Sequence, residues 1–242
     1  MGDHVLFDHI AIAVPRLADV PRALVDELGG TAGFGAVAGA FVFARWRFDG
    51  GGRLEVLEPR GEDSFLHRFL AQRGPGIHHA TFKVPSLREA IRRAEELGHL
   101  VVGVDESNPS WKEAFLHPSR ALGILVQLAE SRSPRGLPPP RREAPARPSS
   151  APPPVRIVGL RTRASSAERA RRQWELLLRG ACLEGTEGPL VFRWPDSPLR
   201  LAVDIDGAGE EGPIAIELRS DRRIATAGKP HPTLGAVLTQ LP

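Results

Sequence analysis

The sequence predicts an α+β fold made of paired βαβββ modules, and three observations support this prediction. Two strand-like segments each carry a histidine, His9 or His79, that is followed five positions later by a valine. An amphipathic helical pattern follows each of these segments. A later strand-like segment then carries one side chain that can bind a metal, Glu55 or Gln127, at 46 and 48 positions after the histidine. The repeated order indicates that one small unit occurs twice.

The first copy is expected to contain a strand, a helix and three further strands. In the segment 5–14, large apolar residues alternate with His9 and two alanines, so the histidine face should line an open cavity. A helix is expected over 19–28, because Asp19 can cap it, Pro21 suits its first turn, and two glycines follow. Strands are expected near 33–37 and over 40–48 and 53–58.

The second copy repeats this order. A strand over 77–84 precedes a helix that opens with the capping box from Ser86 to Glu89 and ends at Gly98. Three more strands are expected, at 99–104, 112–117 and 123–128.

Residues 131–154 are mainly proline, arginine and serine, with almost nothing to bury. Such a segment cannot form a packed element and is typical of a semi-extended linker. We therefore predict a metal-binding domain over 1–130 and a shorter domain over 155–242.

The C-terminal region is predicted to be a degenerate copy of the first domain, with one helix fewer. Three of the four candidate metal-binding positions are occupied by side chains that cannot bind a metal, and only Gln240 persists in this alignment. His9, Glu55 and His79 correspond to Gly159, Ala202 and Ala215. Because a missing helix would expose an apolar sheet face, the copy is expected to pack on the first domain or on a second subunit.

Composition excludes several classes of protein. The single cysteine, Cys182, rules out an internal disulfide framework and a cysteine-rich zinc site. There is no secretion signal pattern and no apolar run near ~18 residues, so we expect a cytoplasmic protein without a membrane segment. Residues 1–130 contain 14 basic and 17 acidic side chains, so the net charge of +3 comes from the rest of the chain. No nucleic-acid partner is expected, because the arginine-rich parts lack interleaved aromatic residues and known motifs.

The repeated histidines suggest a metal site. A lone histidine on a strand is usually a core or surface residue, but here two occupy equivalent positions and each has a partner on an equivalent later strand. Two imidazoles, one carboxylate and one amide suit one divalent ion such as Co, Ni, Mn, Zn or Fe, with open positions for water or a small-molecule substrate. The predicted ligands are His9, Glu55, His79 and Gln127.

Five motifs together resemble those of a known family. They are DHIAIAV (8–14), RLEVLEP (53–59), FLAQRGPGIHHATFKV (69–84), FLHP (115–118) and GILVQL (123–128). These motifs are similar to those of the vicinal oxygen chelate superfamily, which includes glyoxalase I, extradiol dioxygenases and bleomycin-resistance proteins, and the nearest pattern is methylmalonyl-CoA epimerase. The resemblance covers most of 4–130 and implies a glyoxalase-like cleft with one divalent metal on His9, Glu55, His79 (not His78) and Gln127.

The chain departs from the epimerase pattern at two places. The epimerases and glyoxalase I have a glutamate at the position of Gln127, and the epimerases carry a second acid on the strand that matches 41–48. Epimerisation next to a carbonyl needs a base on each face of the carbon or one mobile base, and a glutamine cannot accept a proton. Glu55 is then the main candidate catalytic carboxylate. Glu113 is the second candidate, although a solvated surface carboxylate is the simpler interpretation.

The predicted function is that of a metal-dependent isomerase or lyase acting on a small carbonyl compound or a CoA thioester by metal-assisted enolisation. A glyoxalase I-like lyase and a non-catalytic drug-binding or resistance protein are the alternatives. An Fe(II) dioxygenase is a third, but its carboxylate usually lies where this chain has Gln127. The sequence does not name the substrate or the metal, and it leaves open whether the protein is an enzyme and whether it forms a homodimer.

Overall fold

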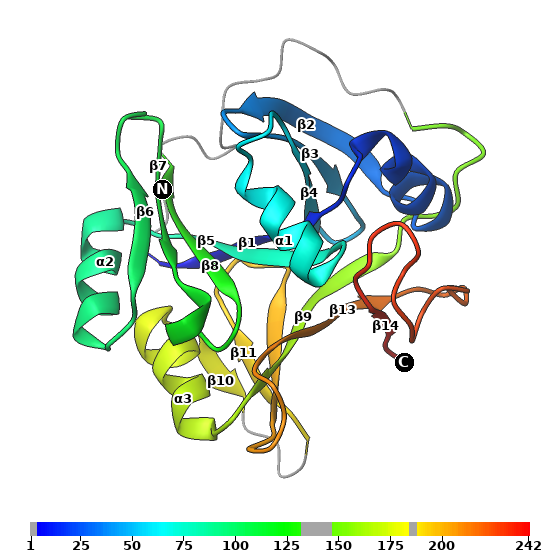
Figure 1. Ribbon diagram of the computed structural model, residues 1–242. Helices are drawn as coiled ribbons and strands as arrows, with labels where there is room; N and C mark the ends of the chain where they lie inside the picture. Colours follow the sequence, from blue (N-terminus) through cyan, green and yellow to red (C-terminus); the bar gives the residue numbers. More distant parts are fainter. Residues whose placement is uncertain (1–3, 132–146, 184–187) are drawn as a thin grey trace. The chain divides into compact units, whose positions relative to one another are not determined.

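The structure is a computed structural model that describes residues 4–131, 147–183 and 188–242. The described strands form two sheets (Figure 1). Across the larger sheet, the order is β2 (Thr31–Ala38), β3 (Phe41–Arg47), β4 (Arg53–Pro59), β1 (Leu6–Ala13), β5 (Gly76–Lys83), β8 (Leu125–Ser131), β7 (Trp111–Leu116) and β6 (Val101–Asp105). Across the smaller sheet, it is β10 (Ala181–Leu183), β11 (Leu190–Arg193), β12 (Arg200–Ile205), β9 (Arg156–Ala164), β13 (Gly212–Arg219) and β14 (Leu238–Gln240).

The larger sheet contains the predicted repeat. In each half, the first strand pairs in parallel with the last strand of its own module, β1 with β4 and β5 with β8. The two middle strands then continue outward in antiparallel pairing to the edge of the sheet. This arrangement confirms the predicted α+β fold of paired βαβββ modules.

The helical segment of the first module differs from the prediction. In place of one helix over 19–28, the chain forms a 3₁₀ turn at Leu17–Asp19 and a π-helical segment at Arg22–Glu27, and Asp19 does not act as a side-chain cap. Both segments stop before Gly29, whose φ of +71° favours glycine. A Cβ atom on Gly30 would lie 2.7 Å from the Phe48 ring, so only a glycine allows the chain to pack this closely against Phe48.

The second module contains one predicted helix and is preceded by one that the sequence analysis missed. Helix α2 (Leu87–Glu96) packs on β6, β7 and β8 (Figure 1), and the Ser86 side chain accepts a hydrogen bond from the Glu89 amide, as a capping box requires. Helix α1 (Phe65–Arg73) was not predicted, although Ser64 precedes an apolar pattern there. A further 3₁₀ turn lies at Pro118–Arg120. None of the helices in the described part of the chain combines the length and apolar character that a membrane crossing requires.

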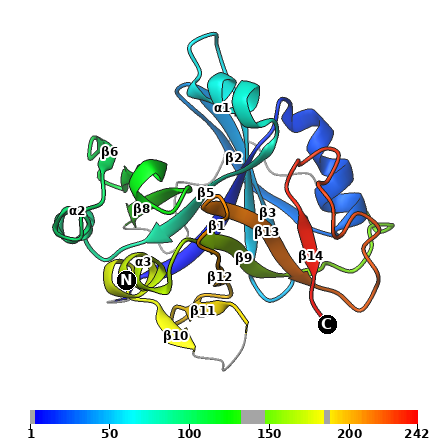
Figure 2. The same ribbon diagram turned by 60° about the horizontal axis from the view of Figure 1, so that its bottom comes forward.

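The C-terminal copy begins with the predicted strand and helix. Helix α3 (Ala167–Arg171) continues into a π-helical segment at Arg172–Leu177. Ser166 caps α3 by accepting a hydrogen bond from the Arg169 amide. Strand β14 lies directly beside β13 (Figure 2), and the described residues between them form no helix, in agreement with the predicted loss of one.

Strand register supports most of the predicted correspondence between the copies. Glu55 lies opposite Ala11, and Ala202 lies opposite Arg161, so Gly159 takes the position of His9. The correspondence with Gln240 is wrong by one residue. In the first domain, Thr81 lies two positions after His79 and is opposite Gln127. In the C-terminal copy, Glu217 lies two positions after Ala215 and is opposite Thr239, so Thr239 is the equivalent of Gln127. Gln240 instead holds the loop that follows β13, through hydrogen bonds with Ser220, Arg222 and Ile224.

The described chain forms two compact units, each drawn from separate stretches of sequence. One comprises 4–8, 79–131, 159–183 and 188–214, and the other comprises 9–78, 147–158 and 215–242. The unit boundaries fall within β1, β5, β9 and β13. The predicted domain limits at 130 and 155 remain a prediction, since 132–146 of the predicted linker lie outside the described residues.

In both units, residues of the C-terminal copy pack against residues of 1–130. In the first, the Trp194 ring lies 5.8 Å from Phe7 and 4.9 Å from Phe82, and the Ser197 hydroxyl donates to the Phe7 carbonyl. In the second, the Glu27 carboxylate accepts from the Thr226 hydroxyl and pairs with the His231 imidazole. The copy therefore packs on the first part of the chain, which was one of the two expected arrangements.

Glu211 provides a test of how the loop before β13 is attached to α3. Partial burial raises the pKa of its carboxyl, but hydrogen bonds from Arg169 and Ser165 outweigh this effect and lower the pKa to about 2. The folded state therefore gains stability above the ordinary pKa of 4.5, and this gain is lost as the pH falls toward 2.

We expect Glu211→Gln to lower the melting temperature at pH 7 and to flatten its dependence on pH between about 4.5 and 2. Thermal unfolding followed by circular dichroism over this range measures the effect. Glu210→Gln changes an exposed neighbour and is the matched control. If both variants follow the same pH profile, the stabilising role of Glu211 is wrong.

Candidate metal centre

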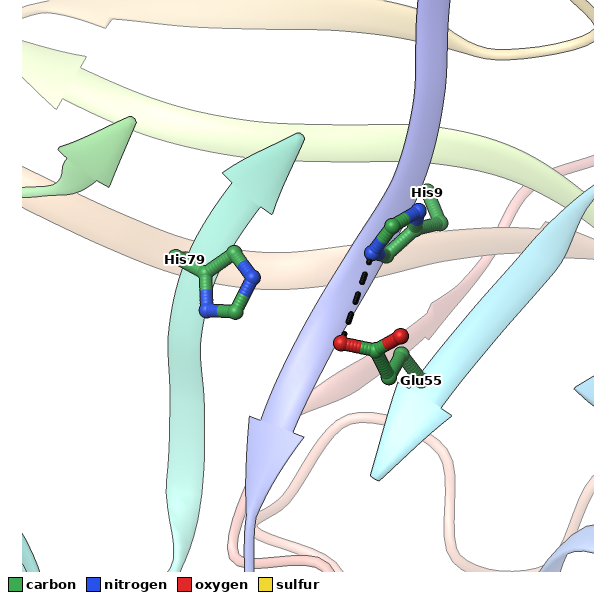
Figure 3. A group of neighbouring side chains, drawn as sticks. All are labelled: His9, Glu55 and His79. Carbon is green, nitrogen blue, oxygen red and sulfur yellow. Dashed lines mark ion pairs between the residues drawn. The ribbon is translucent and has the colours of Figure 1, made fainter. Parts of the chain in front are cut away.

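Three neighbouring strands of the larger sheet bring the side chains of His9, Glu55 and His79 together (Figure 3). Each residue offers a ligand atom, and these atoms all lie within 4.8 Å of one another. The three residues are almost fully buried, with 0%, 5% and 5% of their surfaces exposed. His9 Nε2 lies 3.5 Å from Glu55 Oε1. Three of the four predicted ligands therefore converge.

Alternation along the strands explains why these side chains share one face. On β1, Ile10 and Ile12 are fully buried on the face opposite His9. On β4, Leu54 and Val56 are likewise buried on the face opposite Glu55. The residue opposite Glu55 on β1 is Ala11, whose methyl group leaves space around the carboxylate.

The sequence analysis missed Arg45. This residue lies opposite Glu55 in the β3–β4 ladder, and its Nε donates to Glu55 Oε2 at 2.5 Å. Both side chains are at least nine-tenths buried, and the guanidinium carbon lies 5.4 Å from the centre of the Phe43 ring. Alternation of Phe41, Phe43 and Arg45 was visible in the sequence, but only the strand register shows which residue Arg45 meets.

Gln127 takes part in a hydrogen-bond chain with residues on both neighbouring strands. Its Oε1 accepts from the Thr81 hydroxyl at 2.6 Å, and its Nε2 donates to Glu113 Oε2 at 2.7 Å. The same oxygen of Glu113 accepts from Trp111 Nε1 at 2.7 Å. The amide of Gln127 is therefore oriented from both ends. Its predicted role as a ligand and that of Glu113 as a catalytic acid or base stay predictions.

His78, which was set apart from the ligand set in the sequence analysis, packs among aromatic rings. Its ring centre lies 5.8 Å from that of Phe65 and 4.8 Å from that of Phe69. Burial lowers the pKa of His78 to about 4, although the negative charge of Glu55 acts in the opposite direction. His78 is therefore a neutral aromatic neighbour of the site at neutral pH.

The His9, Glu55 and His79 side chains fit a divalent ion. Ligand atoms that share an ion at about 2.0–2.2 Å lie about 3–4 Å apart, so separations within 4.8 Å need only small side-chain movements. Two imidazoles and one carboxylate form the donor set that first-row transition ions prefer. A cavity of about 590 Å³ borders β2, β3 and the helical segment Arg22–Glu27, and its lining includes Arg45 but none of the three ligand residues.

Comparison with known proteins gives the family. A model of the Glyoxalase/Bleomycin resistance protein/Dioxygenase superfamily matches residues 8–115. The uncharacterized protein YqjC of Bacillus subtilis is 31% identical over 127 residues, a match that covers 51% of this chain and 90% of that protein. The chain belongs to this superfamily. The resemblance noted in the sequence is thereby confirmed.

Solved structures agree with this assignment. A hypothetical protein of Bacillus halodurans is 29% identical, with a TM-score of 0.50 over 53% of this chain and 96% of that one. Methylmalonyl-CoA epimerase of Mycobacterium tuberculosis is 25% identical, with a TM-score of 0.50 over 56% of this chain and 94% of that one. A mutant 4-hydroxymandelate synthase of Streptomyces coelicolor is only 15% identical, but its TM-score is 0.61 over 91% of this chain and 72% of that one. This last similarity shows that the shared fold extends into the C-terminal copy.

The buried pair of Arg45 and Glu55 leads to a stability prediction. Arg45→Met removes one partner and leaves the carboxylate of Glu55 without its closest positive charge. Breaking a buried ion pair in this way costs about 3–5 kcal/mol, so we expect a decrease of this order in the free energy of unfolding. Urea denaturation measures it, with the exposed Arg47→Met on the same strand as control. A loss below about 1 kcal/mol would show that the pair is not needed for folding.

Proposed function

We propose that the chain is a metal-dependent isomerase or lyase that acts on a small carbonyl compound or a CoA thioester by assisted enolisation. The convergence of His9, Glu55 and His79 on three adjacent strands is the observation that carries this proposal. His9, Glu55 and His79 would hold one divalent ion, and Gln127 is the proposed fourth ligand. A bound divalent ion would polarise the substrate carbonyl and so acidify the adjacent C–H bond.

The carboxylates of the chain have different parts in this proposal. Glu55 is held by Arg45 on one oxygen and lies near His9 with the other, so it is better suited to bind a cation than to move between two faces of a substrate. Within the described residues, Trp111 and Gln127 each donate a hydrogen bond to Glu113, and both bonds are to its Oε2. Its Oε1 is the atom that we propose takes the proton from the substrate carbon.

The similarity to methylmalonyl-CoA epimerase supports an isomerase, but the departures limit it. Gln127 cannot accept a proton, and Arg45 is a cation on the strand where the epimerases are expected to carry an acid. We therefore propose metal-assisted enolisation with one base, Glu113, and not a two-base epimerisation. Glu113 also lies on β7, whereas Gln127 lies on β8, so the base approaches from a different strand than a glutamate at 127 would.

One observation favours a second candidate, a non-catalytic small-molecule binding protein. Arg45 already neutralises the charge of Glu55, so a stable site does not require a bound cation. A glyoxalase I-like lyase would use the same proposed ligands, and no feature of the described residues favours it over an isomerase.

Alanine variants of two adjacent histidines, His78 and His79, test whether the chain binds a metal at the proposed site. The purified chain should bind about one divalent ion, His79→Ala should lose almost all of it, and His78→Ala should keep it. His78 packs against Phe65 and Phe69, and neighbouring side chains on a strand point to opposite faces. Elemental analysis measures the metal, with circular dichroism as the control for folding. Full retention by a triple alanine variant at His9, Glu55 and His79 would exclude the site.

The catalytic part is tested by proton exchange in heavy water. With methylmalonyl-CoA as probe, Glu113→Gln should reduce the exchange rate of the metallated protein by about 100-fold or more, because it removes the base. Gln127→Glu should keep the metal and raise exchange, because a carboxylate can both bind a cation and accept a proton. Unchanged exchange in the Glu113 variant would remove its proposed role, and no exchange in any folded, metallated variant would favour the binding protein.

A further inference from the structure

We propose that a cavity of about 400 Å³, bordered by the first residue of β9 and the last residue of β13, binds a phosphate group through Arg156, Arg219 and Arg222. This site goes beyond the proposed function and does not depend on it, because its lining includes none of the proposed metal ligands and not Glu113. A cavity of this size is in the range of small-molecule sites, so the phosphate would be free or part of a small compound.

The charge of the cavity lining is the observation that carries the proposal. Three arginines and two aspartates, Asp49 and Asp221, line the cavity, which leaves an excess of one positive charge. In the part of the chain that the structure describes, none of these five side chains forms an ion pair. Both aspartates are exposed, where water weakens their repulsion of an anion, whereas direct contacts with the arginines are charge-assisted hydrogen bonds.

The backbone around Arg156 fixes where this side chain lies. The carbonyl of the preceding Val155 accepts a hydrogen bond from the Asp49 amide at 3.1 Å. A Cβ atom on Gly50 would lie 2.9 Å from Arg156 Nε, so a larger residue there would displace the guanidinium. The neighbouring wall of the cavity is formed by prolines 153 and 154, whose fixed φ angles make it rigid.

Arg222 lies in a loop whose shape is fixed by Gln240. The amide nitrogen of this glutamine donates to the carbonyls of Ser220 and Arg222, at 3.1 Å and 2.8 Å. Its Oε1 accepts from the Ile224 amide at 3.0 Å. Arg222 Nη2 also donates to the Glu27 carbonyl, so the guanidinium is held before any ligand binds. Such preorganisation lowers the entropy that binding would otherwise cost.

The number of arginines favours a phosphate over a carboxylate. A phosphate group carries about −1.5 to −2 charges at pH 7 and has three strongly accepting oxygens, one for each guanidinium. A carboxylate has a single charge and two oxygens, so it would leave one of the three guanidiniums without an acceptor. The planar, paired donors of a guanidinium also match the geometry of phosphate oxygens. We therefore expect a phosphate to bind more tightly than a carboxylate.

Isothermal titration of the full-length chain tests the proposal at constant ionic strength, with inorganic phosphate, ribose 5-phosphate, ribose and acetate as probes. We expect saturable binding of both phosphates with a dissociation constant below about 1 mM, at least about tenfold tighter than that of acetate, and no binding of ribose. Tighter binding of ribose 5-phosphate than of inorganic phosphate would assign the site to a phosphorylated small compound. Equal or weaker binding would assign it to free phosphate.

Substitutions at the cavity separate a specific site from general attraction to a basic surface. Arg219→Gln should weaken phosphate binding about tenfold or more, because it removes a charge-assisted hydrogen bond. Arg223→Gln removes an equally exposed arginine that does not line the cavity, and this matched control should change the affinity less than about twofold. Asp221→Asn should tighten binding about two- to fivefold, because it removes a repelling charge.

Thermal unfolding gives a second measurement of the same site. Saturating phosphate should raise the melting temperature of the parent chain and of Arg223→Gln, but not that of Arg219→Gln. Circular dichroism confirms that each variant is folded. The absence of saturable phosphate binding, acetate binding as tight as that of phosphate, or equal losses in Arg219→Gln and Arg223→Gln would overturn the proposal.

Discussion

The buried negative charge of Glu55 is the constraint on which the site depends. A carboxylate that is only 5% exposed must be compensated, and Arg45 on β3 supplies the opposite charge. His9 on β1 lies 3.5 Å from the other carboxylate oxygen, and a ligand atom of His79 on β5 lies within 4.8 Å, so the position of each neighbour follows from strand pairing. The order β3-β4-β1-β5 is therefore as necessary to the site as the residues themselves.

Arg45 and a divalent ion would both bind the carboxylate of Glu55, and this competition determines the net charge of the site. In an epimerase-like pattern, acidic residues surround the ion and can exchange protons. Here a guanidinium holds one oxygen of Glu55, and an amide takes the place of a glutamate at Gln127. Both departures remove negative charge. They leave Glu113 as the proposed catalytic carboxylate, outside the group of proposed ligands.

The C-terminal copy has the strand pairing of the first module without its candidate ligands. The register of β9 with β12 retains that of β1 with β4, although Gly159 and Ala202 stand where His9 and Glu55 would be. In one unit, the copy is held by apolar packing of Trp194 against Phe7 and Phe82. In the other unit, the polar anchor of Glu27 with Thr226 and His231 fastens the end of the chain to the first module.

The sequence by itself determined the fold class, the repeat and the two histidines, because alternation and helix capping depend on residues that are near in sequence. It did not determine the helical form of 17–27 or the existence of α1, where the local signals were weak. Only the tertiary structure showed that Arg45 meets Glu55, that Gln127 is held between Thr81 and Glu113, and that Thr239 rather than Gln240 takes the position of Gln127. Each of these depends on strand register, and a shift of one residue reverses which side chain faces the site.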